Sequence, residues 1–123
     1  MTTTPSIHLA RVYDNLDDVR GARLLVDRVW PRGVTKSELA LDDWIREVAP
    51  STALRKWFAH DVEKWGIFQR RYRAELDGRN EPVSRCLDWC RRGEVVLLFG
   101  ARDRIHNQAV VLKEYLCERF ADR

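Results

Sequence analysis

The apolar run Val95-Val96-Leu97-Leu98-Phe99 constrains the fold more than any other part of the chain. It has the length and composition of a strand, and it ends at Gly100. Helical patterns of apolar residues precede and follow it along the chain. Because a continuous apolar strand between helices is typical of α/β layers, we predict an α/β fold with a short, largely parallel sheet flanked by helices.

Two further strands are predicted in the first quarter of the chain. Residues 7–13 alternate between apolar and polar side chains, which favours a strand. Residues 23–29 contain a continuous apolar run, which indicates a strand buried on both faces that ends before Pro31 and Gly33. The link between these strands is too short for an ordinary crossover helix, so the sequence leaves their relative direction open.

Helices are predicted where apolar residues recur at steps of three and four. Ser51 is placed to cap one helix and Asp61 the next. The stretch 35–43 is compatible with either a loop or a short helix. The four predicted helices run from Ser51 through Phe58, from Asp61 to Gly78, from Pro82 to Gly93, and from about Arg104 to Ala121.

The length of 123 residues fits one domain, so we predict a single domain over residues 1–123 with a flexible N-terminus at residues 1–5. A hydrophobic content of 45% and a charged content of 33% are typical of a globular chain and exclude a disordered one. No apolar run is long enough to cross a bilayer, and the first residues lack the features of a signal peptide. We therefore expect a cytoplasmic protein without membrane contact.

The three cysteines, Cys86, Cys90 and Cys117, lie within apolar helical patterns, which favours reduced core thiols over a disulfide framework. Cys86 and Cys90 share a predicted helix face, but zinc needs a second pair of ligands, so no metal site is predicted. The chain also lacks a P-loop and a GxGxxG motif, and no cofactor is predicted.

The charge balance is mildly basic. There are 22 Lys and Arg against 19 Asp and Glu, the net charge is +3, and the two signs are interspersed along the chain. The cations comprise 18 Arg and 4 Lys, which is explained by a compositional bias without any functional role. An arginine therefore needs a second argument before it is assigned to a site.

Three segments carry a resemblance to a known family: residues 24–33 (LLVDRVWPRG), 49–61 (APSTALRKWFAHD) and 97–116, which contains HNQAVVLKEYL. Together they resemble the YeaO-like family of small bacterial proteins, over nearly the whole chain from Arg11 onward. The resemblance implies an α/β fold and no established reaction. Many relatives have a histidine where this chain has Gln108, and a wider branch has a Cys-His-Arg cluster in that region. Because glutamine cannot titrate, this departure from the relatives argues against an acid, base or nucleophile at position 108.

Two motifs follow predicted strands and define a candidate site, because ligands of open α/β sheets bind beyond the carboxyl ends of the strands. The first runs over residues 27–33 and the second over residues 102–108, where the chain enters a helix whose free N–H groups favour an anion. Arg28, Arg32 and Arg102 either form forked bonds to a carboxylate or phosphate, or pair with acids such as Asp27 to tie loops together. Trp30 either stacks on a ligand ring or plugs the end of the sheet.

The middle motif adds Arg55, Trp57 and His60. His60 lies beside Asp61 in a predicted loop and is either a general base or an ordinary surface histidine. We predict His60 and Asp27 as the proton acceptors of the site. The predicted ligand-binding residues are Arg28, Trp30, Arg32, Arg55, Trp57, Arg102, His106, Asn107 and Gln108.

These residues suggest a binding or enzymatic site for a small anionic metabolite or nucleotide. Nucleic-acid binding is an alternative, supported by five Trp and the basic balance. A non-catalytic interaction or regulatory module is the other alternative. The sequence leaves the oligomeric state open.

Overall fold

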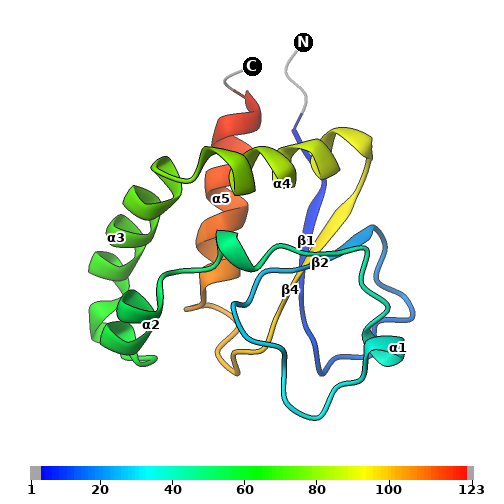
Figure 1. The fold of residues 1–123 in the computed structure, drawn as a ribbon, viewed down its shortest axis with the longest axis horizontal. Helices are drawn as coiled ribbons and strands as arrows, with labels where there is room; N and C mark the ends of the chain where they lie inside the picture. Colours follow the sequence, from blue (N-terminus) through cyan, green and yellow to red (C-terminus); the bar gives the residue numbers. More distant parts are fainter. Residues whose placement is uncertain (1–3, 122–123) are drawn as a thin grey trace.

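The computed structural model describes residues 4–121, so residues 1–3 of the segment predicted to be flexible lie outside the described residues. The chain forms a four-stranded parallel sheet in the order β1-β4-β2-β3 (Figure 1). The strands are β1 (Ile7–Arg11), β2 (Ala22–Leu25), β3 (Asp43–Trp44) and β4 (Val95–Phe99). The predicted α/β class, with one small domain and a short parallel sheet, is confirmed.

Strand β4 lies at the centre of the sheet and is buried along its whole length. It pairs with β1 from Ile7↔Val95 to Arg11↔Phe99, and with β2 from Ala22↔Val95 to Leu25↔Leu98. Since β1 and β2 both run parallel to β4 on its two sides, they are parallel to each other without being neighbours. The short link over residues 12–21 therefore crosses β4 without a helix, which answers the question that the sequence left open.

The two faces of the sheet are covered differently (Figure 1). Helices α3 (Trp65–Asp77), α4 (Asn80–Arg92) and α5 (Gln108–Ala121) pack on one face around the larger apolar cluster. The other face carries a smaller cluster, closed by α1 (Lys36–Leu39) and by loops. Alternate residues of β4 enter the two clusters, as the pleat of a strand requires.

The predicted helix caps are confirmed. Ser51 accepts a hydrogen bond from the Leu54 N–H at 3.1 Å and begins α2 (Thr52–Phe58). Asp61 accepts from the Glu63 N–H at 3.0 Å and begins the 3₁₀ turn η2 (Val62–Lys64), which leads into α3. Both side chains satisfy N–H groups that the first turn of a helix leaves without an internal partner.

The stretch 35–43 contains both a helix and a strand. Thr35 and Glu38 form a reciprocal capping box at the start of α1. The two-residue strand β3 then pairs with the edge of β2. No apolar pattern in the sequence indicated this strand. The 3₁₀ turn η1 (Arg46–Val48) follows it.

Several predicted boundaries were wrong. Strand β1 ends at Arg11 instead of Tyr13, and α4 begins at Asn80 instead of Pro82. Helix α5 begins at Gln108 instead of Arg104, because Asp103 accepts hydrogen bonds from the Ile105 and His106 N–H groups and holds a turn there. Strand β2 ends at Leu25 instead of Val29, because the chain leaves the sheet to form the loop that carries Asp27.

The three cysteines are free thiols. Cys86 and Cys90 are buried, and Cys117 is half-buried. Burial raises the pKa of Cys86 to about 12 and the pKa of Cys90 to about 11, so both remain protonated at neutral pH. No helix among residues 4–121 combines the length and the apolar character needed to cross a bilayer.

Candidate functional site

A cavity of about 430 Å³ lies at the carboxyl ends of β2 and β4. Its walls come from the loop after β2, the segment leading into α2, the turn after α2, and the loop that joins β4 to α5. In Figure 1 this region lies where α2 approaches the start of α5. Seven of the eleven predicted site residues line it: Asp27, Arg28, Arg55, His60, His106, Asn107 and Gln108.

Asp27 lies between the ends of the two central strands. One carboxylate oxygen, Oδ2, accepts a hydrogen bond from the Gly100 N–H at 2.9 Å, and Oδ1 accepts from the Gln108 side-chain amide. Burial raises the pKa of this carboxyl above its usual range, against the opposing effect of both hydrogen bonds and of Arg55. A Cβ atom at position 100 would lie 3.0 Å from Oδ2, so glycine leaves the room that this contact needs.

His106 and Asp103 form a hydrogen-bonded pair beside the cavity. The His106 Nδ1 atom lies 2.8 Å from Asp103 Oδ2, and the ring packs against Trp65 with a centroid distance of 5.2 Å. The His106 and Ile105 N–H groups, and then the His106 ring, lower the pKa of Asp103 to about 2. Because the ionised Asp103 holds the proton on Nδ1, His106 keeps Nε2 as an acceptor in its neutral form.

His60 occupies a strained turn at the cavity mouth. Both Ala59 (φ 44°) and His60 (φ 59°) adopt left-handed backbone conformations, which reverse the chain after α2. His60 is exposed, and within residues 4–121 it has no carboxylate partner, since Asp61 is engaged as a cap. The paired histidine of this site is therefore His106, although the sequence pattern pointed to His60.

The cationic side chains at the cavity differ in whether they are already hydrogen-bonded within the chain. Arg28 donates from Nε to the Pro50 carbonyl at 3.2 Å and from a terminal nitrogen to the Ala49 carbonyl at 3.1 Å. It thus fixes the wall that these two residues form. Arg55 and Lys56, both on α2, are exposed at the mouth and form no hydrogen bond or ion pair with another described residue. They are the groups most available to an external anion.

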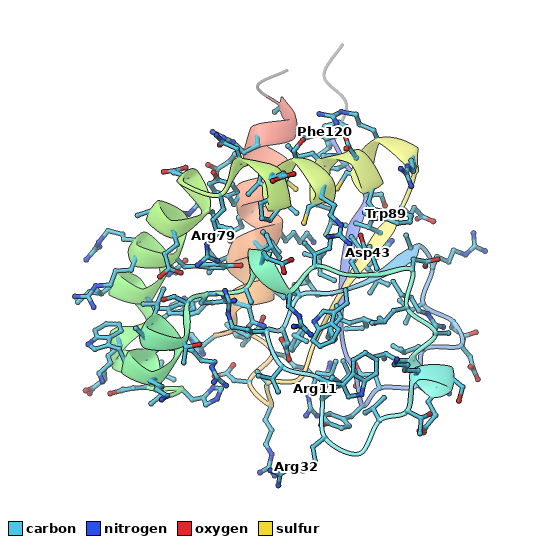
Figure 2. All side chains as sticks on the ribbon, in the orientation of Figure 1. Arg11, Arg32, Asp43, Arg79, Trp89 and Phe120 are labelled. Carbon is cyan, nitrogen blue, oxygen red and sulfur yellow. The ribbon has the colours of Figure 1, made fainter. Side chains whose placement is uncertain are left out.

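Four predicted residues do not line the cavity. Trp30 donates to the Val34 carbonyl at 2.7 Å and packs edge to face on Trp44, so it plugs the loop side of the sheet. Trp57 faces α3. Arg32 extends away from the rest of the molecule, as Figure 2 shows. Arg102 is exposed and also lies outside the lining, so the structure does not assemble the expected cluster of three guanidinium groups.

Several lining residues were not predicted. Lys56 adjoins Arg55 in the same motif, and the helical pattern of α2 places Phe58 in the core, yet neither was assigned to the site. Asp103, which is outside the lining but bonds to His106, was not predicted either, although it lies three residues before His106, a spacing that allowed the pair to be anticipated. Nothing in the sequence indicates that Phe68 lines the cavity, because only the packing of α3 against α2 brings it there.

The start of α5 adds positive potential. Asn107 is buried, and its side-chain oxygen caps the helix by accepting from the Val110 N–H at 3.2 Å. The helix dipole places partial positive charge at this end. No hydroxyl or thiol group occurs among the described residues that line the cavity, so it lacks a serine, threonine or cysteine nucleophile. Within residues 4–121, no three His, Cys, Asp or Glu side chains are grouped as a metal site.

The family model and the related sequences assign this chain to the same family. Residues 6–123 match the family described as the inactive DUF488-N3 subclade. The chain is 40% identical over 111 residues to the uncharacterised protein YeaO of Escherichia coli K12, covering 90% of this chain and 96% of that one. It is 41% identical over 76 residues to the uncharacterised proteins Rv3073c of Mycobacterium tuberculosis and Mb3100c of Mycobacterium bovis, covering 62% of this chain and 64% of theirs. No solved structure matches it. The chain therefore belongs to the YeaO-like family, within the subclade described as inactive.

Proposed function

We propose that this chain is a binding module that holds a small anionic metabolite or nucleotide in the cavity without transforming it. One observation carries the proposal. Two cations without a partner among the described residues, Arg55 and Lys56, line the same cavity as the N-terminus of α5. Cavities of this size, with apolar walls and a few convergent polar groups, are typical of small-molecule sites.

The absence of a hydroxyl or thiol among the described lining residues argues against covalent catalysis by a serine, threonine or cysteine. The description of the subclade as inactive agrees with this choice. In the proposed module, His106 and Asn107 orient the ligand, and Arg28 keeps the Ala49-Pro50 wall in position. Arg55 and Lys56 supply charge-assisted hydrogen bonds to its anionic group.

The tryptophans do not favour the nucleic-acid alternative, because nonspecific single-strand binding uses aromatic faces that are free to stack on bases. All five tryptophans have partners within the described chain. Trp30 packs on Trp44, Trp57 carries Lys64 and Arg71, Trp65 stacks on Phe68, and Trp89 donates to Asp43.

A thermal-shift panel of phosphate, pyrophosphate, dicarboxylates and nucleoside monophosphates tests the proposal. A ligand at one hundred times its Kd stabilises the folded chain by about 2.7 kcal/mol, which is a measurable rise in Tm. We expect the double variant Arg55→Gln/Lys56→Gln to lose this rise.

The double variant Arg70→Gln/Lys36→Gln is the matched control, because it removes the same charge from exposed positions outside the cavity lining. It should retain the full shift. If no anion raises the Tm of the unmodified chain, or if both double variants lose the shift equally, the proposed site is wrong.

A further inference from the structure

Asp27 has acceptor capacity that the protein does not use. A carboxylate offers about four lone-pair positions. Within the described residues, the Gly100 N–H and the Gln108 amide each occupy one position, on different oxygens. Both oxygens can therefore accept a second hydrogen bond, and Asp27 is among the residues that line the cavity.

The cavity thus has two chemically distinct ends. Asp27, at the end of β2, supplies a carboxylate that is fixed by two donors. Arg55 and Lys56, on α2, supply cations at the mouth, and Arg55 is near enough to act electrostatically on Asp27. Apolar surface of Phe58, Phe68 and Pro50 also lines the cavity. A simple anion would use the mouth and leave the two free acceptor positions of Asp27 without a ligand donor.

We propose that the ligand joins its anionic group to a planar pair of adjacent N–H donors, which Asp27 binds through the free position on each oxygen. This inference rests on the proposed function and adds the chemical class of the ligand. A fork of two parallel N–H groups matches the two oxygens of a carboxylate and gives both bonds a favourable geometry.

Two kinds of small molecule have this chemistry. A guanine nucleotide presents two adjacent N–H groups on the edge of its base and carries a phosphate. A guanidino acid presents a guanidinium group and carries a carboxylate. Both place donors at one end and an anion at the other, and they differ in whether the donor group is neutral or charged.

Isothermal titration with the purified full chain separates these sources. The nucleotide series is GMP, IMP and AMP. GMP has both N–H donors on one base edge, IMP keeps only the ring N–H, and AMP has an acceptor in place of that ring N–H. The guanidino series is 4-guanidinobutyrate against hexanoate, which has a similar chain and no donor. We expect the donor-bearing member of one series to bind at least about tenfold more tightly than the member without donors.

The variant Asp27→Asn tests the role of the carboxylate. An asparagine at this position retains an acceptor for the Gly100 N–H, and rotation of the Gln108 amide provides an acceptor for its new NH₂ group. The variant should therefore fold, which a circular dichroism melt checks. We expect it to lose the tenfold preference and, in the nucleotide case, to favour XMP, whose carbonyl replaces the exocyclic amine of GMP.

The outcomes separate the inference from the proposed function. If anions bind through Arg55 and Lys56 but both series bind without preference, the donor pair is refuted and the anion site stands. If the preference survives Asp27→Asn, Asp27 is not its source and the inference is overturned. If no member of either series binds and no anion of the thermal-shift panel raises the Tm, both proposals fail. Because the two ligand series need only the unmodified chain, the requirement for a donor pair is tested even if the variant does not fold.

Discussion

Four arginines each donate hydrogen bonds to two backbone carbonyl groups on other segments of the chain. Arg11 reaches the carbonyls of residues 100 and 101, Arg23 those of 16 and 39, Arg28 those of 49 and 50, and Arg79 those of 47 and 49. A guanidinium group can do this because its donors form a rigid fork. At the residue scale, four of the 18 arginines therefore hold loops in place through their side chains.

Arg28→Ala should lower the free energy of unfolding by about 1.5–3 kcal/mol, since two hydrogen bonds from a charged donor are lost. Arg102→Ala should change it by less than about 0.5 kcal/mol, because Arg102 is exposed and has no hydrogen bond or ion pair to another described residue. Urea denaturation of both variants measures the difference. Equal effects would contradict the role assigned to Arg28.

At the element scale, the sequence predicted what depends on local patterns. The apolar run of β4 and the caps at Ser51 and Asp61 depend on neighbouring residues, and the structure confirms them. Strand β3 could not be predicted, because a strand of two residues is too short to show an alternating apolar pattern. It forms only because the tertiary fold brings these residues beside the edge of β2. The site was predicted in part for the same reason: residues that follow β2 and β4 reach one edge of a parallel sheet, whereas the direction of each side chain depends on packing.

The close approach of the segments preceding β2 and β4 depends on Gly21. Its φ of 111° is unfavourable for other residues, and a Cβ atom there would lie 2.8 Å from the backbone of Glu94. Gly33 also has a positive φ, 78°, but a Cβ atom there would meet open space, which makes it the matched control.

Gly33→Ala should cost about 1–2 kcal/mol of stability from backbone strain alone. Gly21→Ala should cost about 1–3 kcal/mol more, because the Glu94 backbone must also move. Thermal and urea unfolding measure both changes. Similar losses in the two variants would show that the contact with Glu94 is readily relieved.

At the scale of the whole molecule, two carboxyl groups with opposite pKa shifts shape the dependence of stability on pH. The folded pKa of Asp27 is raised, so between its unfolded and folded values the folded chain binds more protons. Stability from this group therefore decreases as pH rises through that range. The pKa of Asp103 is lowered to about 2, so its contribution is present above the unfolded value near 3.8 and is lost as pH falls toward 2.

Urea denaturation between pH 2 and pH 8 should resolve the two effects by difference. Asp27→Asn should remove part of the loss of stability on the alkaline side of pH 4. Asp103→Asn should remove part of the loss between pH 4 and pH 2, and should lower stability at neutral pH. Subtracting the stability curve of the unmodified chain from that of each variant cancels the contributions of the titratable groups that both proteins share. Parallel curves for all three proteins would contradict both assignments.

The brevity of β3 has a consequence for how copies of the chain behave at high concentration. A strand at the border of a sheet normally exposes a row of N–H and C=O groups on which another molecule can add its own strand. Here that border offers a ladder of two residues, Asp43 and Trp44. So few backbone groups cannot hold an incoming strand in register, and this side of the sheet resists the stacking that leads to aggregation.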